Sequence, residues 1–136
     1  MEKVISLLDT NVLVRFLTLD NAKKYKNLYT FFESLERGEM RIELKLIVLF
    51  QTIFILKSVY QVPRKQIAGG LMDLLNYKGI VVKEKKIVLR MLALWHEKNI
   101  EIVDCYLLAC IEKDPLSILY SYDRDFDKFN INRKEP

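Results

Sequence analysis

Short apolar runs alternate with stretches of helical periodicity along this chain, and the alternation restricts the possible folds more than any other feature. A short apolar run bounded by polar or turn residues is typical of a strand buried in a parallel sheet. Such strands alternating with helices predict an α/β fold in which helices cover a parallel sheet. The expected strands or extended links are residues 4–8, 41–44, 79–82 and 117–122.

Local start and stop signals divide the rest of the chain into helices. Asp20 and Asn21 provide a capping signal for a helix that Gly38 ends. Pro63 opens a later helix, because proline is tolerated in a first turn, and Asp104 is placed to cap another. The segment 47–60 is so apolar that we expect a buried helix. The other expected helices are 11–17, 63–75, 84–98 and 105–113.

The size and composition of the chain predict one domain that spans residues 1–136. The chain has 136 residues and is 51% apolar, enough for a single packed core. No stretch of ~20 residues lacks a charge, and the N-terminus lacks a signal-peptide pattern, so we expect no membrane span and a cytoplasmic location. Cys105 and Cys110 fall on different sides of one expected helix, so we expect two reduced thiols and no disulfide.

Three aspartates fall where a parallel sheet brings side chains together. Asp9 follows the first expected strand, Asp123 follows the last, and Asp104 begins a helix on a connection that leaves the same edge. Ligands of open parallel sheets bind beyond the carboxyl ends of the strands, so we expect the three to converge. Their oxygens suit Mg²⁺ or Mn²⁺, which neutralise charge on a phosphodiester. Each aspartate also has a simpler interpretation as a cap or turn residue.

Three segments of the sequence resemble the motifs of PIN domains. Residues 7–14, LLDTNVLV, resemble the opening signature, in which an aspartate ends the first strand. Residues 103–109, VDCYLLA, resemble the central motif with an aspartate at the head of a helix, and residues 119–127, LYSYDRDFD, resemble the closing motif. The order and spacing match over essentially the whole chain. The chain is also similar in size to the VapC-like toxins of bacterial and archaeal toxin–antitoxin pairs.

The resemblance implies a three-layer α/β/α fold with a short, mostly parallel central sheet, and the activity of a metal-dependent endoribonuclease. Asp9, Asp104 and Asp123 would hold one or two Mg²⁺ or Mn²⁺ ions, and hydrolysis of RNA would leave a 5′-phosphate and a 3′-hydroxyl. The implied partners are RNA, a cognate antitoxin whose peptide covers the acidic cleft, and a second copy in a homodimer. The supporting residues that the resemblance implies are Thr10, Asn11, Ser121 and Asp125.

One position departs from the family pattern. The family carries a glutamate in the middle of its third helix, and this chain carries Gln51 there. An amide oxygen can still coordinate a metal or its water, but it brings no negative charge. Cation binding and proton transfer should therefore weaken. Glu101, three residues before Asp104, offers a compensating carboxylate, and it also has the simpler interpretation of a solvated first-turn acid.

The departure at Gln51 leaves more than one function open. The chain is either an active metal-dependent ribonuclease or a catalytically weakened PIN domain that binds RNA or an antitoxin. A third possibility is a metal-dependent nuclease or phosphatase with another substrate. Thr10 and Asn11 follow Asp9, so the DxD motif that a phosphatase would need is missing. The net charge of +4 mildly favours an anionic partner.

Overall fold

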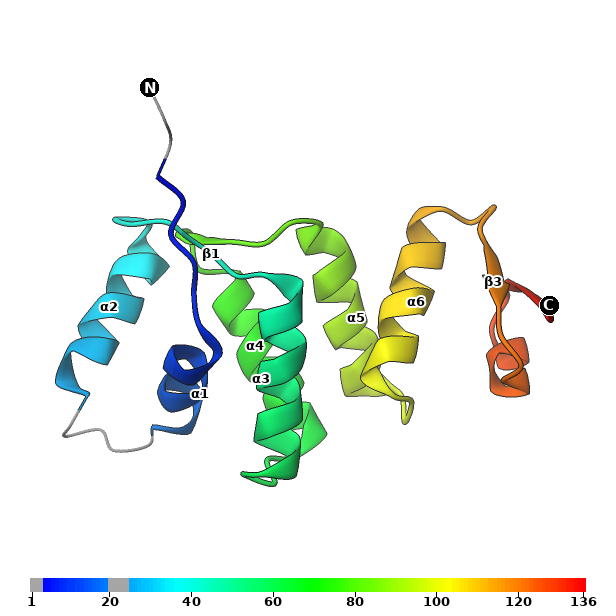
Figure 1. Cartoon of the computed structure of the whole chain (residues 1–136), viewed down its shortest axis with the longest axis horizontal. Helices are drawn as coiled ribbons and strands as arrows, with labels where there is room; N and C mark the ends of the chain where they lie inside the picture. The colour runs from blue at the N-terminus through cyan, green and yellow to red at the C-terminus, as the bar shows by residue number, and fades with distance from the viewer. Residues whose placement is uncertain (1–3, 20–24) are drawn as a thin grey trace.

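The computed structural model of the chain describes residues 4–19 and 25–136, and it consists of packed helices joined to short parallel strands (Figure 1). The expected α/β fold is confirmed. The helices are α1 (Thr10–Thr18), α2 (Lys26–Arg37), α3 (Leu46–Ser58), α4 (Arg64–Leu75), α5 (Lys85–Glu97), α6 (Ile102–Lys113) and the 3₁₀ helix η1 (Arg124–Lys128). The strands are β1 (Ile42–Glu43), β2 (Ile80–Val81), β3 (Ile118–Tyr120) and β4 (Asn132–Lys134).

The helix ends follow from local sequence signals. Asp9 caps α1, since its Oδ1 accepts a hydrogen bond from the Thr10 N–H at 2.7 Å. Gly38 ends α2 with a φ of 78°, a left-handed conformation that glycine adopts without a steric penalty. Both ends were expected from the sequence. The capping signal at Asp20 and Asn21 lies outside the described residues.

The first sheet brings together three segments that are distant in the sequence. β1 pairs in parallel with β2, with Ile42 opposite Ile80. On the other side of β1, Leu7 forms a single parallel bridge with Glu43. The Gly79 carbonyl accepts the Ile42 N–H at 2.8 Å. β1 is therefore the middle segment, with β2 and the N-terminal segment on its two sides.

The prediction that residues 4–8 form a buried strand is wrong. Val4, Ile5 and Leu7 are 91%, 69% and 60% exposed, and only the last residue of the run, Leu8, is buried. A parallel strand becomes buried when strands lie on both sides of it and helices cover both faces. Here β1 pairs with the segment on one side, which leaves its outer edge at the margin of the sheet.

The C-terminal residues 117–136, called here the C-terminal unit, form a second and separate sheet. β3 pairs in parallel with β4, with Leu119 opposite Arg133. The strands are parallel as expected, but the described ones form two pairs rather than one central sheet. Figure 1 shows the C-terminal unit beyond α6, while the N-terminal segment lies over α1 and α3.

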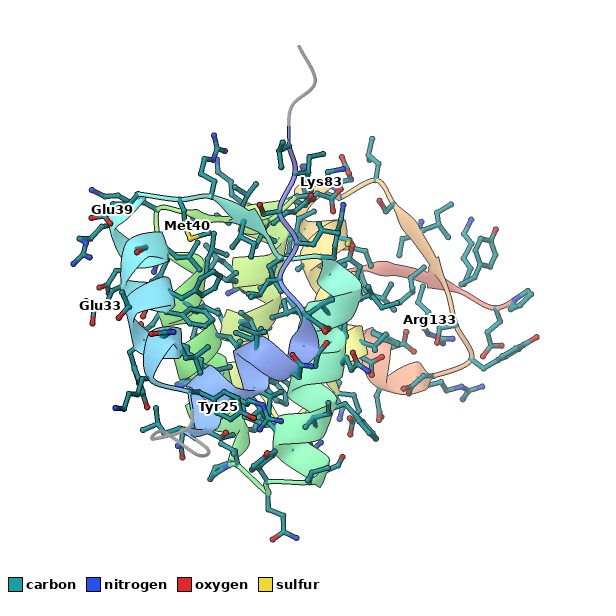
Figure 2. All side chains as sticks on the ribbon, turned by 60° about the vertical axis from the view of Figure 1, so that its left-hand side comes forward. Tyr25, Glu33, Glu39, Met40, Lys83 and Arg133 are labelled. Carbon is teal, nitrogen blue, oxygen red and sulfur yellow. The ribbon has the colours of Figure 1, made fainter. Side chains whose placement is uncertain are left out.

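Arg133 holds the C-terminal unit together. Its guanidinium donates to both carboxylate oxygens of Asp127, at 2.8 and 3.1 Å, and to the Ser121 carbonyl at 2.8 Å. A further bond of 3.3 Å reaches Glu135. This two-pronged contact raises the pKa of Arg133 and lowers that of Asp127, because each ion stabilises the charged form of the other. Figure 2 shows Arg133 on the opposite side of the molecule from Glu33.

The buried apolar residues of the described ranges form one cluster that runs from Leu8 to Phe126. The segment 47–60 forms the expected helix over most of its length, but the prediction that this helix is buried is wrong. One face of α3 packs inward through Leu49, but Ile47 and Phe54 are 78% and 67% exposed. None of the helices in the described ranges is long and apolar enough to cross a membrane.

Candidate functional site

Asp9 and Gln51 line the same surface hollow, although they are far apart in the sequence. The Thr10 hydroxyl, buried at the start of α1, donates to Gln51 Oε1 on α3 at 2.6 Å. Asp9 is exposed beside Thr10 and holds the first turn of α1. The Thr10 bond therefore fixes the position of the Gln51 amide relative to the Asp9 carboxylate. The second lone pair of the Gln51 oxygen is left to accept another donor or a cation.

These residues line an open hollow of about 400 Å³, called here the Asp9 hollow. Its walls are Asp9, Thr10, Asn11, Val14, Arg15, Gln51, Ile55, Val59 and Tyr60. The polar side chains come from the start of α1 and the middle of α3. The hollow thus contains four of the residues that the sequence singled out, and it is wide enough to receive part of a polymer chain.

Arg15 is the residue of the Asp9 hollow that the sequence did not single out. It is half-buried, and its guanidinium lies 4.7 Å from the centre of the Tyr25 ring. The ring face attracts the cation and limits the conformations of the long side chain. A guanidinium held in this way can donate to a phosphate oxygen. The sequence signal for Arg15 was weak, because a single cation on a helix is usually a solvated residue.

Asp104 lies inside the first turn of α6, so the prediction that it caps this helix is wrong. The helix begins at Ile102, and the capping position is held by Glu101. The Glu101 side chain is exposed and makes no capping hydrogen bond. The helix starts earlier than expected because residues 102 and 103 are apolar and continue its periodicity. A carboxylate in the first turn still benefits from the positive end of the helix dipole.

Asp123 is held by the turn that follows β3. Its Oδ1 accepts the Asp125 N–H at 2.9 Å, and its own N–H donates to the Ser121 hydroxyl at 3.0 Å. It therefore caps η1, as a turn aspartate commonly does. Ser121 supports the local backbone of Asp123, and its supporting role in the site remains a prediction.

Asp104 and Asp123 line a second, much smaller hollow of about 20 Å³, called here the Asp104 hollow. Burial raises the pKa of Asp104 above its usual range, and the negative charges of Asp123 and Glu101 raise it further. The space suits one object the size of a water molecule. The walls of the Asp104 hollow are Ile100, Asp104, Leu108, Asp123, Asp125, Phe126 and Phe129.

The expected ligands therefore form two groups within one chain. Asp9 lines one hollow, while Asp104 and Asp123 line the other. Within residues 4–19 and 25–136, no three acidic, histidine or cysteine side chains lie close enough to hold one ion. The cause is topological, because Asp9 ends a segment of the first sheet and Asp123 follows a strand of the second. The three-aspartate set remains a prediction.

The residues present fit a cation held by two carboxylates. Mg²⁺ is commonly bound through one or two carboxylates, with waters and substrate phosphate completing its shell. Asp104 and Asp123 repel each other across a space of suitable size, and a divalent cation there would remove that repulsion. Asp125 lies at the rim of the same hollow and can bind a water of such a shell.

Cys105 is a packing residue and takes no part in this chemistry. Its side chain is fully buried, and burial raises the pKa of the thiol to about 11. The thiol therefore stays protonated and unreactive at neutral pH. Cys110 is likewise a free thiol. In this structure Cys105 and Cys110 are not joined by a disulfide.

The model of the PIN domain family matches residues 6–132, which include every candidate site residue. No curated protein matches the chain.

Proposed function

The chain belongs to the PIN domain family, whose members are typically nucleases, and we propose that it is a metal-dependent endoribonuclease of the toxin type. The observation that carries the proposal is the Asp104–Asp123 pair, which lines a hollow large enough for one small ion or water. The Asp9 hollow, which Asp9, Arg15 and Gln51 line, is wider and would receive the polymer.

The side chains of the two hollows have distinct tasks in this proposal. A divalent cation, when bound, supplies positive charge beside the scissile phosphate and makes a water more acidic. Asp104 and Asp123 bind the cation, and the Asp125 N–H fixes the Asp123 carboxylate beforehand. Asp104 is partly buried beside the apolar residues of the hollow, and this burial strengthens its electrostatic contacts.

In the Asp9 hollow, the chain's own residues orient the RNA. The Arg15 guanidinium binds a backbone phosphate oxygen, because it is preorganised against Tyr25. Gln51, held by Thr10, orients a water or a polar group of the substrate. A negatively charged polymer also suits the net charge of +4. We further propose a cognate antitoxin and a homodimer as partners, and a cytoplasmic location where RNA is available.

The test of this proposal is cleavage of a mixed-sequence single-stranded RNA with Mg²⁺ or Mn²⁺. We expect the native protein to cleave it, and we expect both EDTA and the Asp9→Asn substitution to suppress cleavage. DNA of the same sequence serves as the substrate control, since only RNA carries the 2′-hydroxyl. Folded protein that cleaves neither polymer with any cation would refute the proposal. Equal cleavage of both polymers would show a nuclease that is not specific for RNA.

A second candidate function rests on Gln51. If an amide at this position has removed activity, the domain binds RNA or an antitoxin without cleaving. The Gln51→Glu substitution separates the two functions, because Thr10 can donate to a carboxylate in the same geometry. We expect cleavage to rise about 10- to 100-fold, the usual scale for groups that support a metal site. Steady-state cleavage assays at a fixed Mg²⁺ concentration measure this increase in the cleavage rate.

The matched control for this substitution is Gln66→Glu, an equally conservative change at an exposed position of α4. It adds the same charge at a residue that does not line the Asp9 hollow, so it should leave cleavage unchanged. A native protein that is inactive and becomes active with Gln51→Glu would establish the weakened binding module. An active native protein that gains nothing would mean that Gln51 does not contribute to the site.

A further inference from the structure

The N-terminal end of α5 and the C-terminal end of α6 border an open groove of about 570 Å³, called here the α5–α6 groove. α5 packs against α6 and runs in the opposite direction, so both of these ends lie at the top of Figure 1. The walls of the groove are Glu84, Lys85, Lys86, Ile87, Arg90, Ala109, Glu112 and Lys113. Four of these side chains are cationic and two are anionic, so the groove carries an excess of positive charge.

Three lysines contribute most of this excess charge. In the part of the chain that the structure describes, the ammonium groups of Lys85, Lys86 and Lys113 form no ion pair with a carboxylate. Arg90 differs, because its Nε and Nη2 donate to the two carboxylate oxygens of Glu112 at 2.8 and 3.1 Å. The two bonds hold the guanidinium in place, and its remaining N–H groups can donate to an anion in the groove.

Two of these lysines stand where a cation disfavours its own helix. Lys85 and Lys86 occupy the first turn of α5, where the positive end of the helix dipole favours an acidic residue, and that turn contains none. Lys86 and Arg90 are also four residues apart on one helix face, a spacing at which like charges repel. A bound anion would remove both repulsions. The fold therefore gains nothing from this charge, whereas an anionic ligand would.

The two hollows of the proposed nuclease do not attract a polyanion by themselves. Three aspartates, Asp104, Asp123 and Asp125, line the Asp104 hollow. In the Asp9 hollow the positive charge of Arg15 is balanced by that of Asp9. Proteins bind nucleic acid largely through cations that neutralise its phosphates. The α5–α6 groove supplies the excess of cations that both hollows lack.

Resting on the proposed nuclease function, we propose that the α5–α6 groove binds the phosphate backbone of the RNA at a distance from the bond that is cleaved. The walls of the groove contain no aromatic ring on which a base could stack. Their two apolar members, Ile87 and Ala109, are buried and offer little apolar surface to a peptide. Charge is what remains for recognition, and contacts to phosphate carry no sequence information. The groove therefore holds RNA of any sequence.

The position of the groove relates RNA length to affinity. Asp104 lies in the first turn of α6 and Lys113 in its last turn. The helical rise of 1.5 Å per residue places them about 14 Å apart along the helix axis. Successive phosphates of a stacked strand are ~3.4 Å apart. A stacked strand must therefore continue for about four nucleotides beyond the cleaved bond before it reaches the groove.

Binding of a labelled single-stranded RNA of about 20 nucleotides in EDTA tests the groove without cleavage. The test variant combines Lys86→Gln with Lys113→Gln. The matched control combines Lys65→Gln with Lys78→Gln, which removes the same charge at exposed lysines outside the groove. Lys65, like Lys86, is the second residue of its helix.

The test variant should bind this RNA about 10- to 30-fold more weakly than the native chain at ~0.1 M salt, because each phosphate contact on a single strand contributes a salt slope of about 0.7. The slope of log affinity against log salt concentration should fall by about 1.4 for the two contacts. The control should stay within about twofold. Both variants should remain folded by circular dichroism, since Lys86→Gln removes an unfavourable charge from α5.

Two results of the binding assay would overturn the groove. An equal loss of affinity in the test variant and the control would mean that the total charge of the chain matters and not its position. Polyglutamate serves as the competitor for an acidic polypeptide. If it displaced the labelled RNA as effectively as unlabelled RNA of the same charge, the groove would take an acidic polypeptide instead.

Cleavage kinetics separate this inference from the proposed function. With an active native protein, the test variant should raise KM for the long RNA about 10- to 30-fold. This increase should shrink as the substrate is shortened below about four nucleotides on either side of the cleaved bond. An increase that does not depend on substrate length would overturn the placement of the groove. A native protein that binds RNA through the two lysines but cleaves nothing would support the groove and refute the proposed nuclease.

Discussion

The Asp104→Asn variant is expected to lose RNA cleavage and to gain stability. Loss of one carboxylate from the pair should lower the cleavage rate about 10²- to 10³-fold, the scale for removing one electrostatic group from an active site. The folded protein pays an unfavourable free energy to ionise Asp104, because burial and the charge of Asp123 raise its pKa. The neutral amide removes this cost. With solvent screening included, the free energy of unfolding of the variant should exceed that of the native chain by about 0.5–1 kcal/mol.

The pH dependence of this gain has a definite sign. A carboxyl whose pKa is raised by folding destabilises the fold when it is ionised, so the cost is fully present above the raised pKa. It disappears as the pH falls toward the unfolded value of about 3.9. Urea unfolding in EDTA at several pH values measures the effect. The variant and the native chain should differ at pH 7 and converge near pH 4.

The matched control is Asp73→Asn, an exposed carboxylate on α4 away from both hollows. It should change neither cleavage nor the unfolding free energy by more than a few tenths of a kcal/mol. If Asp104→Asn proved less stable than the native chain at pH 7, the ionised carboxylate would have a stabilising partner. If the variant cleaved RNA normally, the Asp104 hollow would not be the metal site.

The Gly79→Ala substitution should produce the largest loss of stability. Gly79 enters β2 at a point where three backbone segments meet, and its N–H donates to the Leu35 carbonyl at 2.7 Å. A Cβ atom there would overlap the Met40 carbonyl oxygen and lie 2.9 Å from the Leu35 carbonyl oxygen. These are rigid backbone atoms, so the first sheet must shift away from α2. We expect a loss of about 3–5 kcal/mol in the free energy of unfolding.

Gly69→Ala is the control for this substitution. It lies in the interior of α4, and an added Cβ atom meets nothing within 4 Å. Alanine is the better helix former, so this variant should gain about 0.5–1 kcal/mol. Both variants are compared by urea unfolding followed by circular dichroism. Equal stability of Gly79→Ala and the native chain would mean that the close approach of β2 to α2 is relaxed in solution.

The helices were predictable because their signals are local. The glycine that ends α2 and the periodic apolar residues of α5 act within one or two turns, so the sequence alone determines those boundaries. Burial is not local. The apolar run at residues 4–8 predicted a buried strand, but burial requires a neighbour on both sides, and one chain supplies a neighbour on one side. The prediction of a buried helix at residues 47–60 was likewise wrong for the side chains of Ile47 and Phe54, because local sequence does not show which helix face meets a neighbour.

The sequence could name candidate site residues, but it could not predict how they are arranged in space. The motifs identified the three aspartates, since each follows a strand or opens a helix. The hydrogen bond between Thr10 and Gln51 joins two helices and has no signal in either segment. The division of the aspartates between two hollows depends on where the C-terminal unit packs. Short motifs carry no information on that placement.

The order of packing along the chain affects how the molecule forms. α4 packs against α5, and α5 against α6, so this half forms through contacts between neighbours in the sequence. The first sheet instead joins Leu7 to Glu43 and Ile42 to Ile80, and each pairing must close a long loop. Local contacts form faster than distant ones. We therefore expect the first sheet to form after these helices have packed, so that its strand edges stay open for longer than the helix contacts.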